Sequence, residues 1–98
     1  MRTGFVVTSR FRAREGEQRH VEQLVRSILE PVRTEPACVG IEAARDRDDP
    51  NCFYITSRWT DESGHVAHRD LAHTQRFLAA VAPLLDVPMS SVRSVPLA

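Results

Sequence analysis

Hydrophobic and polar residues alternate through the first stretch of the chain, residues 4–14. Alternation with a period of two is typical of a β-strand, because successive side chains point to opposite faces. The face that carries the larger apolar side chains is made of Phe5, Val7, Ser9 and Phe11. We therefore expect a strand here that buries this face against the rest of the chain.

The next stretch has the period of a helix. Its apolar residues recur three and four positions apart and form one continuous stripe. The stripe comprises Val21, Leu24, Val25, Ile28, Leu29 and Val32. Because Pro31 lacks a backbone N–H and disfavours helix at the residue before it, the helix is predicted to end or kink between Leu29 and Arg33.

Two strands are predicted next, over residues 37–44 and 52–60, with Val39 and Ile41 as the apolar residues of the first. The charged loop between them, residues 46–51, is rich in turn formers, so the two strands should pair as an antiparallel hairpin. Side chains of the later strand alternate between two faces. One face carries Phe53, Ile55, Ser57 and Trp59, and the other carries Cys52, Tyr54, Thr56 and Arg58.

The remainder of the chain predicts two helical segments and a fourth strand. Asp61 can cap a helix that begins at Glu62 or Ser63 and runs to about Arg69. Asp70 can start or cap a second segment that runs to about residue 85, and residues 87–97 are predicted as a strand. The order is βαββαβ, the ferredoxin-like α+β fold, in which a four-stranded antiparallel sheet carries two helices on one face. We expect one domain, residues 1–98.

Composition and charge exclude several classes of function. The net charge is zero, so the chain offers no electrostatic footprint for nucleic acid. No apolar run approaches the ~20 residues of a membrane span, and the charged start does not fit a secretory signal, so we expect a cytoplasmic protein. Cys38 and Cys52 should then be free thiols. In the predicted hairpin they lie roughly 23 Å apart, whereas a disulfide needs Cα atoms within about 7 Å.

Three of the four histidines fall within residues 65–73. By helical spacing, His73 shares the apolar face of its segment with Phe77, which predicts a histidine that lines a pocket. His65 and His68 lie on a face that also carries acidic residues, so the pattern predicts them half-exposed. A zinc site needs three or four convergent ligands, and His73 belongs to a different face, so we expect no metal site.

Several short motifs stand in the order of a known family. A strand ends in Arg58-Trp59 and is followed by an acidic turn, by Ala67-His68 and, five residues later, by His73. Residues 34–38 (TEPAC) resemble a Glu-Pro-Gly-Cys entry to a second strand, and residues 45–51 (RDRDDPN) resemble an acidic hairpin turn. Together these motifs resemble the antibiotic biosynthesis monooxygenase (ABM) family, and the resemblance covers nearly the whole chain.

The resemblance implies an assembly and a class of reaction. In that family two sheets meet face to face in a homodimer that forms an α+β barrel, which here would cover Tyr54 and Arg58 at the dimer seam. Relatives include quinol and anthrone monooxygenases, sugar-signal isomerases and haem-degrading enzymes. Ser9 stands where the haem-degrading branch has Asn, and Ser57 stands where many relatives have Glu. These departures weaken the haem-degrading reading and any mechanism that relies on that Glu.

The leading hypothesis is a monooxygenase that needs no cofactor and oxidises a small phenolic, quinol or anthrone-like aromatic. Such chemistry requires a base, a donor for the developing oxyanion and a dry cavity. His73 is the candidate base, with His68 second, and the Trp59 N–H and Ser9 are the candidate donors. The apolar walls of the substrate site are predicted as Phe5, Val7, Phe11, Phe53, Ile55 and Phe77.

Other classes of function stay open at this point. An isomerase of a small keto compound would use the same acid and base without oxygen. A non-catalytic dimer would bind an aromatic metabolite and release it unchanged. Haem degradation ranks last, because of Ser9 and because the sequence shows no obvious axial histidine in a roomy pocket.

Overall fold

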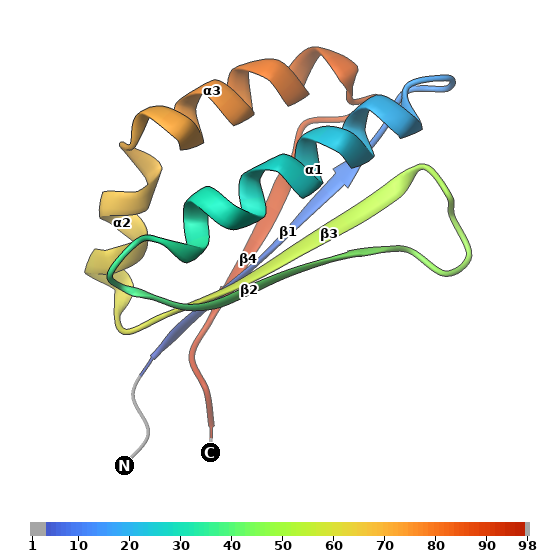
Figure 1. The fold of residues 1–98 in the computed structure, drawn as a ribbon. Coiled ribbons are helices and arrows are strands. Elements are labelled where there is room, and N and C mark those ends of the chain that lie inside the picture. Colours follow the sequence, from blue (N-terminus) through green and yellow to red (C-terminus); the bar gives the residue numbers. More distant parts are fainter. Residues whose placement is uncertain (1–3, 98) are drawn as a thin grey trace.

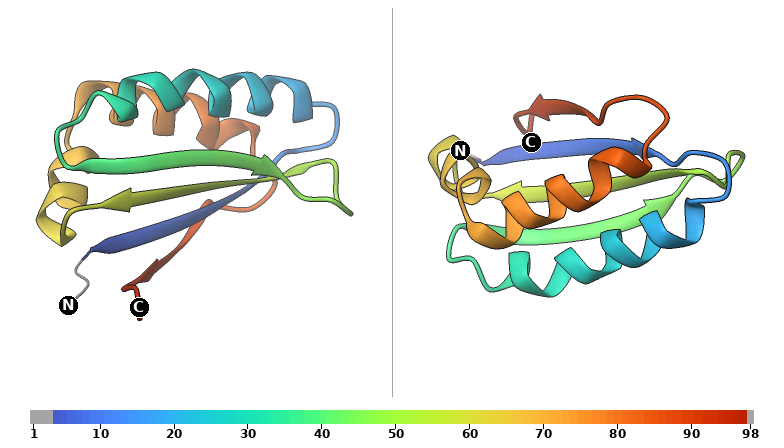
Figure 2. Two further views of the ribbon diagram at one scale, coloured as in Figure 1. Left: turned by 60° about the horizontal axis from the view of Figure 1, so that its bottom comes forward. Right: turned by 90° about the horizontal axis from the view of Figure 1, so that it is seen from above.

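The computed structural model describes residues 4–97, and its elements follow the predicted order. They are β1 (Phe5–Arg12), α1 (Gln18–Arg33), β2 (Cys38–Arg45), β3 (Cys52–Trp59), α2 (Glu62–Arg69), α3 (Ala72–Val81), the short 3₁₀ helix η1 (Ala82–Leu84) and β4 (Ser90–Ser94). The strands form one antiparallel sheet in the order β2-β3-β1-β4. Helices α1 and α3 cross one face of the sheet, and α2 lies at one end of it (Figures 1 and 2). The predicted ferredoxin-like α+β fold is confirmed.

The core lies between the sheet and the helices and is built from the predicted alternating residues. Across β1 and β3, Phe5 stands opposite Trp59 and Phe11 stands opposite Phe53, and all four are buried. The apolar stripe of α1 covers these residues from above, and its buried members are Val21, Val25, Ile28 and Val32. This helix ends at Arg33, inside the predicted interval.

The two outer strands differ from the prediction. In β2 a bulge shifts the register between Cys38 and Gly40, because one extra residue breaks the alternation of faces. Val39 is therefore 66% exposed, while Ile41 packs against the core. Strand β4 is shorter than the predicted residues 87–97, and every residue of it is exposed.

The second helical region breaks one residue later than predicted. Asp61 caps α2 as expected, since its carboxylate accepts a hydrogen bond of 2.9 Å from the backbone N–H of the third helical residue. Asp70, however, ends α2, and α3 begins after Leu71, whose side chain makes no capping bond. The buried residues of α3 are Thr74, Phe77 and Val81, and His73 is only partly buried at the edge of this face.

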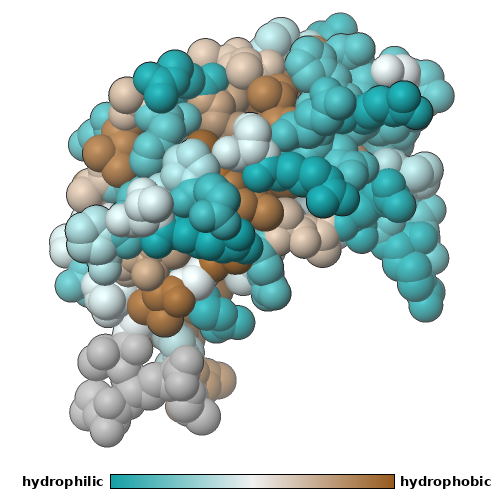
Figure 3. Space-filling model, in the orientation of Figure 1, coloured by the Kyte–Doolittle hydropathy of each residue, from teal (hydrophilic) through white to brown (hydrophobic). Residues whose placement is uncertain are grey.

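Carboxylates hold the loop between β2 and β3, as its turn formers predict. Asp46 accepts hydrogen bonds from the backbone N–H groups of Asp48 and Asp49. Tyr54 donates its hydroxyl to Asp46 over 2.7 Å, and this carboxylate raises the pKa of Tyr54 to about 12. Hydrophilic side chains cover this end of the molecule (Figure 3), so the hairpin tip lies away from the apolar interior.

Both cysteines are free thiols, as predicted. Cys52 is buried at the start of β3, and Cys38 stands opposite Trp59 at the other end of the hairpin. Burial raises the pKa of the Cys38 thiol, which keeps it protonated and weakly nucleophilic.

The face of the sheet away from the helices is bare in residues 4–97 (Figure 2). On it, Val92 of β4 pairs with Thr8 and remains 66% exposed. Among the described residues, none of the helices combines the length and the apolar character that crossing a membrane requires.

Gly64 in α2 offers a test of how this helix is seated. A Cβ atom at this position would stand 2.5 Å from the Cβ of Ala37. Overpacking of this kind costs about 1–3 kcal/mol, and the gain in helix propensity offsets at most about 1 kcal/mol of that. We therefore expect Gly64→Ala to lower the free energy of unfolding, measured by urea denaturation.

Gly40→Ala is the matched control, because a Cβ at Gly40 meets nothing within 4 Å. Equal stability of the two variants would contradict the close packing of α2 against Ala37.

Candidate functional site

A cavity of about 370 Å³ lies between the helices and the sheet. Pockets that hold drug-sized ligands span roughly 300–1,000 Å³, so this one suits a small molecule. Its lining is mixed, with an apolar floor and several polar groups. The lining residues are Val7, Ser9, Phe11, Ile28, Val32, Ile41, Ile55, Ser57, His65, His68, Arg69, Thr74, Phe77, Leu78, Met89, Ser91 and Arg93.

Six of the ten residues predicted for the site line this cavity. They are Val7, Ser9, Phe11, Ile55, His68 and Phe77. The rings of Phe11 and Phe77 meet edge to face with centroids 5.6 Å apart. Aromatic walls of this kind suit a flat aromatic ligand.

The other four predicted residues lie outside the lining. Phe5 and Phe53 are buried in the core at either end of the β1–β3 pair. Trp59 is 1% exposed and is likewise a core residue. His73 stands at the first turn of α3 and turns toward Glu35 instead of the cavity.

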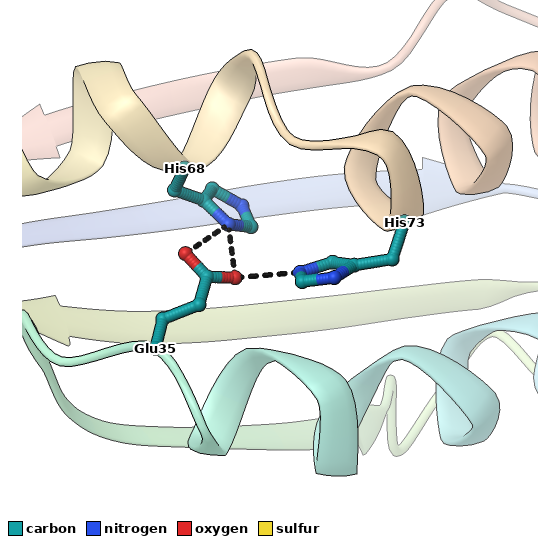
Figure 4. A group of neighbouring side chains, drawn as sticks. All are labelled: Glu35, His68 and His73. Atoms are coloured by element: carbon teal, nitrogen blue, oxygen red, sulfur yellow. Dashed lines mark hydrogen bonds and ion pairs between the residues drawn. The ribbon is translucent and has the colours of Figure 1, made fainter.

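Glu35 joins two of the histidines in a hydrogen-bonded triad. It follows α1 in the chain, and its side chain is only 8% exposed. Its carboxylate lies 2.9 Å from Nδ1 of His68 and 2.7 Å from Nε2 of His73. Figure 4 shows the carboxylate between the two rings, which come from α2 and α3. A buried carboxylate is thereby satisfied by two N–H donors.

The expectation that His68 and His73 do not converge is wrong. The two helices are separate segments, as predicted, and one side chain from each reaches the same carboxylate, which spacing within either helix does not reveal. One ligand atom each from Glu35, His68 and His73 lie within 4.8 Å of one another, and two histidines with one carboxylate can bind a divalent metal. The contacts of 2.7 and 2.9 Å are nevertheless hydrogen-bond lengths, whereas tetrahedral zinc ligands stand about 3.3 Å apart. As it stands, the arrangement is a hydrogen-bonded triad.

His68 is more buried than predicted. Its side chain is 15% exposed, and its ring packs on Trp59 with centroids 4.8 Å apart. Nδ1 faces Glu35 and lies 3.2 Å from the Thr74 hydroxyl, while Nε2 makes no hydrogen bond within residues 4–97. With Nδ1–H donating to the carboxylate, Nε2 is left as a proton acceptor.

His65 lines the cavity one turn before His68. Its ring packs against Phe5 and Trp59, each with centroids 5.7 Å apart. Burial lowers the pKa of His65 below its ordinary value, and the nearby positive charges, including Arg69 and Arg93, lower it further. These surroundings therefore favour the uncharged form of the ring.

Ser57 supplies a polar group that sequence reasoning regarded only as the loss of a carboxylate. The Trp59 Nε1–H donates to its Oγ over 2.9 Å, so the indole N–H is not free for a ligand. Ser57 is buried and lines the cavity. Within residues 4–97 its hydroxyl proton has no acceptor, so the O–H can donate to a bound molecule.

Glu35 is the candidate site residue that periodicity missed. It stands between a helix and a strand, where no repeating pattern says which way a side chain points. The usable signal is its place in the motif of residues 34–38, just after the apolar stripe of α1. A single carboxylate at this position could be buried against one of the two histidines on the later helices.

Comparison with known proteins gives consistent matches. A family model described as "Antibiotic biosynthesis monooxygenase" matches residues 4–80. The chain is 28% identical over 68 residues to "Putative monooxygenase YcnE" of Bacillus subtilis, which spans 69% of this chain and 72% of that protein.

Two solved structures are similar over nearly their full length. Rv0793 of Mycobacterium tuberculosis superposes with a TM-score of 0.92 at 22% identity, covering 97% of this chain and 96% of that one. PA3566 of Pseudomonas aeruginosa superposes with a TM-score of 0.91 at 26% identity, covering 100% and 98%. Both share the fold described above.

Proposed function

We propose a monooxygenase function from one premise: the chain belongs to the antibiotic biosynthesis monooxygenase family. The name of YcnE points to the same class of reaction. In our proposal the protein oxidises a small phenolic, quinol or anthrone-like aromatic with O₂, and its own side chains supply the acid, the base and the oxyanion donor.

The observation that carries this proposal is the orientation of His68. Its Nδ1 is held by a buried carboxylate at 2.9 Å, and its ring lines the cavity. A histidine whose one nitrogen is fixed by a carboxylate presents the other nitrogen as an oriented base. We therefore assign the base to His68 in place of His73, which lies outside the cavity lining and serves as the second partner of Glu35.

The reaction for an anthrone-type CH₂ group balances with these residues. His68 takes one proton from the carbon, the enolate passes one electron to O₂, and the two radicals combine to form a C–O bond. The imidazolium then returns its proton to the peroxide. Loss of the second C–H proton and of hydroxide from the O–O bond leaves a ketone and water. One O₂ thus yields one inserted oxygen atom and one molecule of water.

Ser57 is the proposed donor to the enolate oxygen. Its Oγ accepts the indole N–H, which polarises the hydroxyl and leaves its proton free. An oriented donor in a dry site stabilises charge that develops in the transition state. Ser9, the donor predicted from the sequence, shares a hydrogen bond of 2.9 Å with Ser91 and takes the secondary place.

Oxygen consumption with anthrone or naphthalene-1,4-diol tests the proposal. We expect a rate above the uncatalysed oxidation, one O₂ consumed for each product, and one ¹⁸O atom in the product under ¹⁸O₂. Treatment of the protein with EDTA should leave this rate unchanged.

Two outcomes would contradict the proposal in different ways. A rate that falls with EDTA and returns with an added divalent metal would mean that the triad acts as a metal centre. Turnover of a keto compound without oxygen would favour the isomerase.

The homodimer remains a prediction. It is supported by the bare sheet face, on which Val92 is 66% exposed, since a second sheet would bury that face. The mass of the particle in solution tests it, and a monomeric mass at micromolar concentration would contradict it.

A further inference from the structure

Two of the residues that line the cavity are arginines exposed to solvent. Arg69 is the last residue of α2, and Arg93 lies in the edge strand β4. Both line the cavity and both are exposed, so they stand where the cavity meets solvent. Arg93 pairs in register with Val7, a core residue, so its side chain leaves the strand on the face that the helices cover.

Neither guanidinium has a counter-ion within residues 4–97. Some other arginines have a carboxylate partner, as Arg12 has with Asp49 and Asp86, whereas others, such as Arg76, have none among these residues. No Asp or Glu is among the residues that line the cavity. His65 lies one helical turn before Arg69, and the charges of Arg69 and Arg93 oppose its protonation. The charge of Glu62 acts on His65 in the opposite sense, but Glu62 lies outside the cavity lining. The lining itself therefore carries two arginines and no carboxylate, in a chain whose net charge is zero.

An arginine fork matches a carboxylate, because its planar guanidinium donates two parallel hydrogen bonds. The lining also holds apolar and aromatic residues, among them Phe11 and Phe77, and His68 directly precedes Arg69 on α2. We propose that Arg69 and Arg93 bind a carboxylate on the substrate, so that the aromatic body enters the cavity and its reactive carbon meets His68. This inference rests on the proposed function and narrows its substrate class to carboxylated aromatics.

A measurement of equilibrium binding tests this proposal without depending on catalytic turnover. Isothermal titration would compare 2-naphthoate with 2-naphthamide, which share a ring system and differ in charge. The wild-type protein should prefer the naphthoate, and this preference should shrink as salt is raised. Arg69→Gln and Arg93→Gln should each weaken naphthoate binding by about 10- to 100-fold and leave naphthamide binding unchanged.

Arg76→Gln is the matched control, because Arg76 is exposed on α3, lies outside the cavity lining and gives the same change of net charge. Equal affinity of the wild type for the two probes would overturn the proposal. So would a loss of naphthoate binding in Arg76→Gln as large as in the other two variants. Unaltered far-UV circular dichroism would show that the variants are folded.

The role of Arg69 and Arg93 can also be tested in turnover, by comparing oxygen uptake with 1,4-dihydroxy-2-naphthoate and with naphthalene-1,4-diol, which lacks the carboxylate. A binding preference for the naphthoate with no catalysed oxygen uptake would leave the anion site standing and overturn the monooxygenase. Catalysed oxygen uptake that is equal for the two quinols and unchanged in Arg69→Gln would support the monooxygenase and overturn the anion site.

Discussion

Replacing His68 with glutamine is expected to lower kcat for oxygen uptake by about 10²–10⁴-fold, the contribution of a well-placed general base. The amide can still donate to Glu35, so the carboxylate keeps a partner in place of the Nδ1 contact of 2.9 Å. It cannot take a proton from carbon at neutral pH. Initial rates with anthrone under saturating oxygen measure the effect.

His65→Gln is the matched control for this change. Both histidines lie on α2 and line the cavity, but Glu35 is a hydrogen-bond partner of His68 and not of His65. We expect the His65 variant to keep most of the activity. In His68→Ala, added imidazole should restore part of the rate. If His68→Gln retained wild-type kcat while His73→Gln lost it, the assignment of the base would be reversed.

Glu35→Gln is expected to have the second largest effect and to remove much of the same roughly 10²–10⁴-fold factor. The carboxylate fixes the tautomer of His68 because it can only accept a hydrogen bond. An amide in its place can donate to Nδ1 and so favour the tautomer with the proton on Nε2. That nitrogen could then no longer accept a proton from the substrate.

Non-additivity distinguishes positioning by Glu35 from a separate effect on the fold. The double variant Glu35→Gln/His68→Gln should be no slower than His68→Gln alone, since residues that act as a unit are lost together. Glu30→Gln is the control, because Glu30 is an exposed carboxylate on α1 that pairs with Arg33 at the surface. Multiplying losses in the double variant would contradict the proposed role of Glu35.

The fold could be predicted from the sequence because its strands and its first helix follow simple periods. The faces of β1 and β3 are those that alternation indicates, from Phe5 opposite Trp59 to Phe11 opposite Phe53. Strict alternation would place Val39 and Ile41 on one face, but an inserted residue separates them and leaves no mark in the pattern of apolar residues. Local rules describe regular elements and not the irregularities within them.

The site was predicted less well, for a related reason. The four-residue spacing groups His73 with Phe77, but the buried residues of α3 are Thr74, Phe77 and Val81, so His73 lies at the edge of the buried face and is only partly buried. Glu35 was missed because a loop residue has no periodicity. The convergence of Glu35, His68 and His73 is a tertiary contact between residues 33 to 38 positions apart, and spacing along the sequence does not encode it.

Trp59 is an intrinsic fluorophore, and its contacts with Ser57 and His68 couple it to the cavity. Trp59 is the single tryptophan of the chain, it is shielded from water, and it is bonded to a hydroxyl that lines the cavity. Its emission should therefore respond when a molecule fills the cavity or when the imidazole stacked beside it gains a proton. Occupancy and protonation can thus be followed optically in the unlabelled protein.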